Sequence, residues 1–167
     1  MPIHDPTPIE HRVLSALVEN RAGVLAHVVG LFAARGFNIA SLAVGETEDP
    51  TMSRITLVAE GDQKTIEQIK KQLNKLIDVI KVQDLSEEGF VDRELMLMKV
   101  KNTAAHKAKI GDLTKDFHLR VIENGAKELI LECTESRENN KKIFEALKAI
   151  GVEEIAQTGT VALSKKS

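Results

Sequence analysis

The pattern of apolar and polar residues predicts a definite order of elements in the first half of this chain. Apolar runs over residues 12–19, 37–44, 52–60 and 78–85 have the length and composition of strands. Residues 22–35 and 62–76 instead place apolar residues at steps of three and four, as amphipathic helices do. These helix positions are Leu25, Val28, Val29 and Phe32 in the first segment and Ile66, Ile69, Leu73 and Leu76 in the second. The first half therefore reads βαββαβ.

Glycine and polar residues mark the ends of these elements. Gly36 follows the first helix at the place of a left-handed C-cap, and Asp62 precedes the second helix as an N-cap. Two sets of residues alternate within residues 52–60, namely Ile55, Leu57 and Ala59 against Arg54, Thr56 and Val58. Because successive strand side chains point to opposite sides, the two sets are expected on opposite faces of a sheet.

The second half repeats the pattern. Residues 94–100, 117–122, 127–133 and 153–163 predict strands, and residues 103–116 predict a weaker helix. Another helix has Ser136 as its N-cap and ends at Gly151; its apolar residues are Ile143, Phe144, Leu147 and Ile150. We expect an α+β protein with two consecutive ferredoxin-like βαββαβ domains, at residues 11–86 and 93–167. Residues 1–10 read as a flexible lead. The polar run at residues 86–89 looks like a short linker, and we place the linker between the domains at residues 87–92.

One strand of this topology is expected to pair with another chain. The strand order is 4-1-3-2 with both helices on one face, so the second strand of each domain lies at an edge. Edge strands expose unpaired backbone groups and invite pairing unless charges or proline protect them. Residues 37–44 contain neither. We therefore expect a homodimer built through this strand.

Composition narrows the classes of function. The 167 residues carry a net charge of −2, which gives no overall attraction to nucleic acid or anionic lipid. No apolar run approaches the roughly 20 residues that span a bilayer, and residues 1–6 lack the features of a signal peptide. The single cysteine, Cys133, excludes an intrachain disulfide and is expected to be an inert core residue. A cytoplasmic protein that does not bind membranes is the simplest expectation.

The strongest candidate for a binding site is the turn before the first helix. Residues 19–25, Glu-Asn-Arg-Ala-Gly-Val-Leu, read as strand end, glycine turn and helix start, and residues 35–39, Arg-Gly-Phe-Asn-Ile, open the next strand. Unpaired N–H groups at a helix start suit a small carboxylate. The surroundings are aliphatic, and the sequence shows no phosphate loop, nucleophile–base pair or metal-ligand pattern. These features indicate a sensor of an apolar amino acid rather than an enzyme.

These residues resemble the ACT domain, a small regulatory module that binds amino acids. Further segments that resemble one regulatory family occur in the expected order and spacing. They are residues 31–39, 47–50, 53–56, 72–79 and 91–95, and the similarity reappears at residues 155–159. Together they are similar to the regulatory (small) subunit of acetolactate synthase, also called acetohydroxyacid synthase. The resemblance is specific over residues 12–100 and weaker over residues 101–135. Ala22 departs from the proline that many ACT domains carry at this position.

The resemblance implies a non-catalytic regulatory subunit of a transferase in branched-chain amino acid biosynthesis. The implied partner is a large catalytic subunit that carries thiamine diphosphate, FAD and Mg²⁺; no cofactor is expected in this chain. The small subunit binds valine, leucine or isoleucine, usually valine, and confers activation and feedback inhibition. By resemblance, the effector-site positions are Asn20, Gly23 and Asn38, with Val24, Leu25 and Ile39 beside them.

Two other functions are compatible with this topology. An ACT-type amino-acid sensor could serve another enzyme or a regulator, and co-purification with a large catalytic subunit would distinguish the two cases. RNA-recognition modules share the topology, but they stack bases on exposed aromatic residues. This chain has no Trp or Tyr, and its five Phe residues mostly occupy apolar periodic positions. Nucleic-acid binding is therefore the weaker alternative.

Overall fold

The computed structural model describes residues 10–166, which form two compact units. The first unit contains residues 10–90 and 162–166, and the second contains residues 91–161. Residues 1–9 of the expected flexible lead lie outside the described residues, and Glu10 already belongs to the first strand. The chain thus passes from the first unit to the second and returns, whereas the sequence expectation placed all of residues 93–167 in the second domain.

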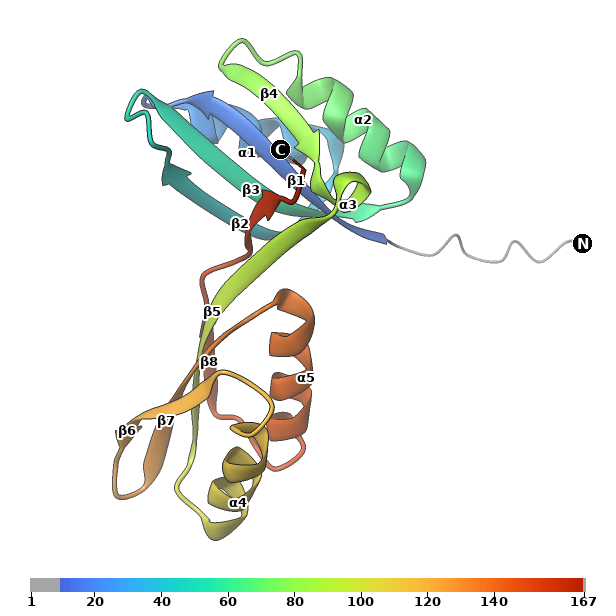
Figure 1. Ribbon diagram of the computed structural model, residues 1–167. Coiled ribbons are helices and arrows are strands. Elements are labelled where there is room, and N and C mark those ends of the chain that lie inside the picture. Colours follow the sequence, from blue (N-terminus) through green and yellow to red (C-terminus); the bar gives the residue numbers. More distant parts are fainter. Residues whose placement is uncertain (1–9, 167) are drawn as a thin grey trace, which may run out of the picture. The chain divides into compact units, whose positions relative to one another are not determined.

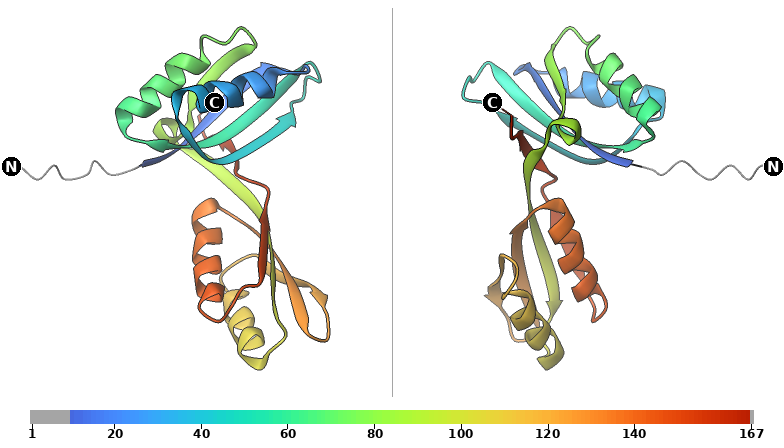
Figure 2. Two further views of the ribbon diagram at one scale, coloured as in Figure 1. Left: turned by 180° about the vertical axis from the view of Figure 1, so that it is seen from behind. Right: turned by 45° about the vertical axis from the view of Figure 1, so that its right-hand side comes forward.

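The first unit is a βαββαβ arrangement with both helices on one face of the sheet (Figures 1 and 2). Its elements are β1 (Glu10–Glu19), α1 (Val24–Arg35), β2 (Asn38–Glu46), β3 (Met52–Gly61), α2 (Gln63–Leu73) and β4 (Val79–Asp84). The antiparallel sheet has the order β2-β3-β1-β4, which confirms the predicted order. Asp62 caps α2 by accepting the Thr65 N–H at 2.7 Å, and Gly36 ends α1 with a φ of +66°, both as predicted.

The core of the first unit lies between this sheet and its two helices. Its buried aliphatic residues include Leu14, Leu57, Ile66, Ile69 and Leu73. The prediction for α1 is wrong at two positions: Val28 and Phe32 are buried, but Leu25 and Val29 are 41% and 39% exposed. Val24 takes an inner position instead. Because α1 is apolar on more than one side, residue spacing alone does not tell which side faces the sheet.

The opposite face of this sheet is also partly covered. Val13 of β1 and Val58 of β3 are buried there against Leu85 and Ala162. Leu85 opens the short helix α3 (Leu85–Glu88), and Ala162 belongs to β9 (Val161–Ser164). The Lys165 N–H donates to the Gly89 oxygen at 3.0 Å, close to the same place. Residues from the end of the chain therefore complete the first unit.

Two predicted segments differ from the structure. The prediction of a linker at residues 86–89 is wrong, because residues 86–88 belong to the helix α3. Asp84 caps this helix by accepting the Ser86 N–H at 3.1 Å, and Ser86 Oγ accepts the Val13 N–H of β1 at 2.9 Å. The single strand expected over residues 153–163 is also wrong, because β8 (Glu154–Gln157) and β9 are separate strands. Gly159 between them has a φ of +87°, a left-handed conformation that interrupts a strand.

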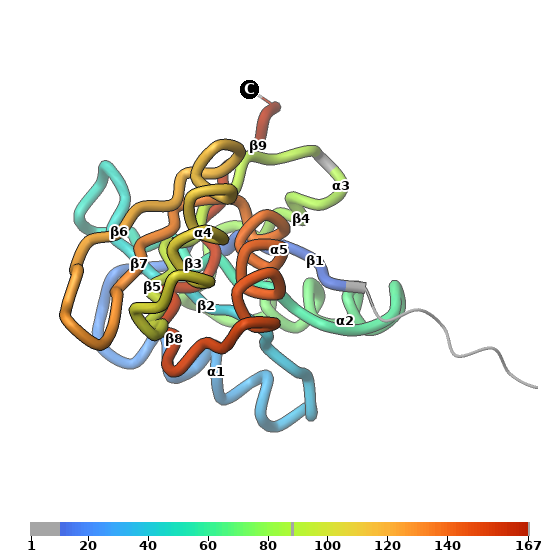
Figure 3. Tube along the Cα trace, turned by 90° about the horizontal axis from the view of Figure 1, so that it is seen from below, coloured from blue at the N-terminus to red at the C-terminus, as the bar shows by residue number. Residues whose placement is uncertain are grey.

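The second unit repeats the topology of the first. Its elements are β5 (Phe90–Lys101), α4 (Ala104–Leu113), β6 (Leu119–Asn124), β7 (Glu128–Glu135), α5 (Arg137–Lys148) and β8, and its sheet has the order β6-β7-β5-β8. Figure 3 shows α4 and α5 side by side. Ser136 caps α5 as predicted, accepting the Asn139 N–H at 3.2 Å. The buried residues include Met96, Met98, Leu131, Ile143 and Leu147. Both units are therefore ferredoxin-like α+β folds, as predicted.

Candidate effector-binding site

The turn between β1 and α1 presents a helix start without a side-chain cap. Gly23 occupies the N-cap with a φ of +90°, and among the described residues no side chain bonds to the first N–H groups of α1. The other helices of ten residues or more are capped by Asp62, Thr103 and Ser136. A Cβ at Gly23 would meet no atom within 4 Å, so the backbone conformation rather than space favours glycine. This helix start is suited to a carboxylate from outside the chain.

Asn20 ties the turn to the hairpin between β2 and β3. Its Nδ2 donates to the main-chain oxygen of Pro50 at 2.8 Å and to Glu46 Oε1 at 3.1 Å. Its main-chain N–H donates to the Thr51 oxygen at 2.7 Å. The exposed amide that the sequence assigns to a ligand therefore also shapes the loop beside the turn.

The remaining predicted site residues differ in burial. Val24 is buried in the core of the first unit, and Ile39 is half-buried against that core. Leu25 is exposed on the first turn of α1. Asn38, at the start of β2, is exposed, and its Nδ2 donates to Glu60 Oε2. Of the three aliphatic residues in the predicted site, Leu25 is therefore the one that is exposed.

The structure places the two halves of the predicted site at opposite ends of the sheet. Glu19, next to Asn20, pairs with Met52, whereas Asn38 pairs with Glu60. Met52 and Glu60 are eight residues apart on β3, which corresponds to about 26 Å. Within one chain, the turn at residues 20–25 and the pair at residues 38–39 are therefore not brought together.

Asp78, between α2 and β4, is a residue beside the turn that the sequence analysis missed. Its side chain is 6% exposed; Oδ1 accepts from Arg21 Nη2 at 2.5 Å, and Oδ2 lies 2.9 Å from His27 Nδ1. The hydrogen bonds to His27 and then Arg21 hold the pKa of the Asp78 carboxyl below its ordinary value. No local motif marks Asp78, because these partners are 57 and 51 residues away in the sequence.

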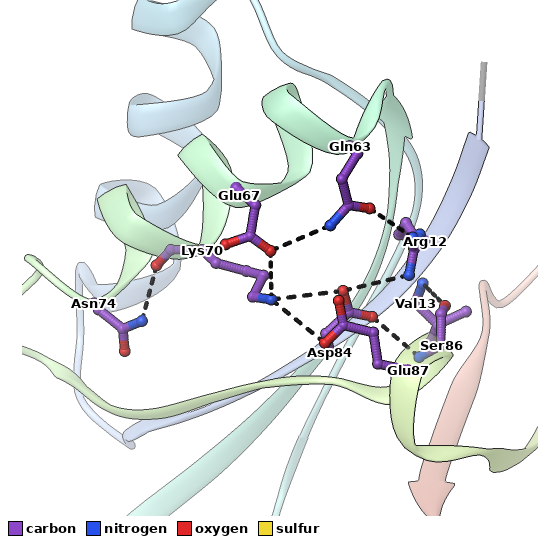
Figure 4. Close-up of polar contacts among 9 residues, drawn as sticks. All are labelled: Arg12, Val13, Gln63, Glu67, Lys70, Asn74, Asp84, Ser86 and Glu87. Atoms are coloured by element: carbon purple, nitrogen blue, oxygen red, sulfur yellow. Dashed lines mark hydrogen bonds and ion pairs between the residues drawn. The ribbon is translucent and has the colours of Figure 1, made fainter. Parts of the chain in front are cut away.

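A second charged group, the Lys70 cluster, joins α2 to β1 and α3 (Figure 4). Lys70 Nζ lies 2.8 Å from Glu67 Oε1, 3.7 Å from Glu87 Oε2 and 3.8 Å from Asp84 Oδ2. Arg12 Nη1 also lies 3.8 Å from Asp84 Oδ2. Burial raises the pKa of the Asp84 carboxyl above its ordinary value. Because a lysine already offsets these three carboxylates, the cluster is a structural salt-bridge network rather than a cation site.

The described residues show little other chemistry. Residues 10–166 contain no group of three or more His, Cys, Asp or Glu side chains that could hold a metal ion. Burial, with a smaller contribution from Glu135, raises the pKa of the Cys133 thiol to about 12. That thiol stays protonated at neutral pH and is a poor nucleophile. None of the helices between residues 10 and 166 is long and apolar enough to cross a membrane.

Two ferredoxin-like units, the first with a glycine turn that leads into an uncapped helix, define a tandem fold of the ACT class. Residues 14–81 match the family described as the AHAS small subunit-like ACT domain, and residues 93–166 match the family described as the small subunit of acetolactate synthase. The chain belongs to the acetolactate synthase small-subunit family.

Individual relatives are similar over both units. The chain is 44% identical to the probable acetolactate synthase small subunit of Methanothermobacter thermautotrophicus over 156 residues, which cover 93% of each chain. It is 44% identical to the acetolactate synthase small subunit of Mycolicibacterium smegmatis over 152 residues, which cover 91% of this chain and 89% of that one. The crystal structure of the small subunit from Thermotoga maritima is 40% identical and has a TM-score of 0.80, covering 95% of this chain and 99% of that one. The assignment thus includes residues 101–135, where the sequence resemblance is weaker.

Proposed function

We propose that this chain is the regulatory subunit of an acetolactate synthase and that a branched-chain amino acid, with valine as the first candidate, binds at the start of α1. The observation that carries the proposal is the Gly23 turn. There, a helix N-terminus without a side-chain cap lies next to the exposed Leu25, in a chain of the small-subunit family. The proposed consequences of this regulation are activation of a large catalytic subunit and its feedback inhibition by the effector.

The energetics of a small amino acid favour a site that encloses it. A carboxylate at a helix N-terminus gains roughly 0.3–1 kcal/mol from the helix dipole. Burial of a valine side chain adds roughly 1.5–3 kcal/mol. Millimolar to micromolar affinity requires about 4–8 kcal/mol, so an open turn on one chain is too weak. A second surface must cover the ligand and hold its ammonium group.

A second copy of the chain can supply that surface. β2 is an edge strand of its sheet, and Val44 on it is exposed. If two β2 strands pair antiparallel about Leu42, Asn38 of the partner subunit lies beside Glu46. Glu46 Oε1 is 3.1 Å from Asn20 Nδ2, so this pairing brings Asn38 of the partner subunit to the turn. The separation of the two asparagines within one chain is then the arrangement that a shared dimer site needs.

The remaining parts of the proposal concern the assembly. The catalytic large subunit is the proposed partner and the proposed carrier of thiamine diphosphate, FAD and Mg²⁺. The cytoplasm is the proposed location of the complex. The effector acts by favouring one arrangement of the dimer, since a ligand shifts an equilibrium only through its different affinity for the two states.

Calorimetry of the full-length chain with L-valine, L-leucine and L-isoleucine tests effector binding, with D-valine as the matched control. Asn20→Ala and Asn38→Ala should each weaken binding, whereas Asn74→Ala at the exposed end of α2 should not. A mixed dimer of one Asn20→Ala chain and one Asn38→Ala chain should recover one intact site, because one of its two sites receives both native asparagines. If both asparagines served a site within the same chain, the mixed dimer would have no intact site.

Reconstitution with a large catalytic subunit of the family then connects binding to regulation. We expect the chain to raise the activity of that subunit and valine to lower it again. A wild-type chain that ignores all three amino acids and leaves the catalytic subunit unchanged would contradict the proposal. Binding of an amino acid without association would instead indicate a sensor for another enzyme.

A further inference from the structure

We propose that Asp78 is a positioning residue that holds the turn at residues 20–23 in the shape that binds the effector. The inference rests on the proposed function, because it assigns a role in that same site. Asp78 itself lies outside the turn, in the connection between α2 and β4. It acts through the residues that it binds and is not assigned a contact with the effector.

Three contacts join Asp78 to both sides of the turn. The Asp78 main-chain oxygen accepts the N–H of Glu19, the last residue of β1, at 3.0 Å. Its Oδ1 accepts from Arg21 Nη2 at 2.5 Å, within the turn. Its Oδ2 lies 2.9 Å from Nδ1 of His27, in the first turn of α1. A single residue therefore fixes the strand before Gly23, the turn itself and the helix after it.

The burial of these groups shows which of them is the anchor. The Asp78 side chain is 6% exposed, whereas the side chains of Arg21 and His27 are 59% and 64% exposed. A buried carboxylate has one fixed position and needs partners, while exposed side chains are held only where a fixed acceptor meets them. Arg21 also bonds to Glu19 through Nε at 2.8 Å, which limits its orientation further. The fixed carboxylate therefore sets the path of residues 20–23.

The same contacts also make the turn compatible with an anionic group. An ionised and unpaired Asp78 near the start of α1 would repel the carboxylate of an amino acid. Hydrogen bonds from His27 and Arg21 offset that charge and leave the helix N-terminus as the attractive feature. The Lys70 cluster contains a similarly buried acid, Asp84, but its partners lie on other elements than the turn.

The test compares Asp78→Ala with Asp62→Ala in the full-length chain. Asp62 is an acid of the same unit that caps α2 and does not contact the turn, so its replacement controls for a general loss of stability. Calorimetry with L-valine should show a Kd at least tenfold higher for Asp78→Ala and a wild-type Kd for Asp62→Ala. Asp78→Asn keeps the shape and one acceptor oxygen, and its Kd should fall between those of the wild type and Asp78→Ala.

A second measurement reports positioning without any ligand. Hydrogen exchange of the amides of residues 20–26 should be at least tenfold faster in Asp78→Ala than in the wild type, whereas Asp62→Ala should affect the amides of α2 instead. If Asp78→Ala does not fold, variants of its two exposed partners, Arg21 and His27, test the assignment instead. Arg21→Ala and His27→Ala should each raise the Kd severalfold, and wild-type Kd values for both would overturn the assignment.

The outcomes separate this assignment from the proposed function. If the wild-type chain binds valine, leucine or isoleucine and Asp78→Ala binds equally well, Asp78 is not a positioning residue and the proposed function stands. If the wild-type chain binds none of the three, the proposed function and the role of Asp78 in effector binding are overturned together. Equal Kd increases in Asp78→Ala and Asp62→Ala would show that only stability is involved, and would also overturn the assignment.

Discussion

Substitutions of Gly23 should separate the stability of the turn from its affinity for the effector. Gly23 has a φ of +90°, and an added Cβ meets no atom within 4 Å, so Gly23→Ala changes only backbone strain. That strain is about 1–3 kcal/mol. Gly23→Asp carries the same strain, but an aspartate at an N-cap accepts helix N–H groups and returns roughly 1 kcal/mol. The aspartate variant should therefore be at least as stable as the alanine variant.

The aspartate variant, although at least as stable as the alanine variant, should bind the effector more weakly than the alanine variant does. A side-chain carboxylate about 4 Å from the effector carboxylate raises the free energy of binding by about 1–4 kcal/mol. This corresponds to roughly a 5- to 1000-fold higher Kd, in addition to the loss of the N–H groups that the side chain occupies. Gly23→Ala, which adds no charge, should lose much less affinity.

Thermal unfolding and calorimetry with L-valine on the full-length variants measure the two effects. Gly151→Ala is the matched control, because Gly151 has a φ of +106° and open space around its Cα but belongs to the second unit. It should lower stability and leave the Kd unchanged. A Gly23→Asp chain that binds valine with the wild-type Kd would refute the placement of the carboxylate at this helix start.

Three further predictions concern stability, and urea unfolding at a series of pH values measures all of them. Burial raises the pKa of Glu135, but hydrogen bonds from the His118 N–H and from Asn139 outweigh it and lower the pKa to about 2. The ionised Glu135 carboxylate therefore stabilises the fold at pH values above its ordinary pKa of 4.5, and this stabilisation is lost as the pH falls toward 2. The Glu135→Gln variant should be about 2–3 kcal/mol less stable at pH 7, and its stability should depend less on pH between 4.5 and 2. Asp84 has the opposite sign, because its raised pKa makes stability fall as the pH rises from 3.8 through that pKa. The Asp84→Asn variant should lack this pH dependence, since an amide does not titrate. Gly30→Ala, in the interior of α1 with nothing near the added Cβ, should stabilise the chain by about 0.5–1 kcal/mol, and a loss instead would show that this side of α1 is packed in solution.

The elements that residue spacing predicted are those whose signals are local. Asp62, Ser136 and Gly36 are caps, and each depends on contacts within four residues. The strand break near Gly159 was missed because the residues on both sides keep a strand-like composition. After the break, Ala162 belongs to the first unit and packs with Val13 and Val58, a contact that no local signal marks.

The candidate site shows the same limit. The turn was located because its glycine and its helix start are adjacent in the sequence. Asp78 was missed because its contacts with Arg21 and His27 cross more than 50 residues. The exposure of Leu25 and Val29 was also missed, because an apolar side chain carries no mark of whether it faces its own sheet or another surface.

In the proposed dimer site, the positions of Asn20 and Asn38 connect effector binding to association of the chain. They are 18 residues apart in the sequence, and α1 carries the chain to the other end of the sheet between them. A site that uses both must take one from each of two copies, so the effector binds the dimer better than the separated chains. Thermodynamic linkage then requires that the effector strengthen the dimer by the same factor by which dimerisation strengthens effector binding. If the proposed shared site exists, effector binding and the pairing of the two β2 strands are therefore coupled, and this pairing is the state to which the proposed catalytic partner would respond.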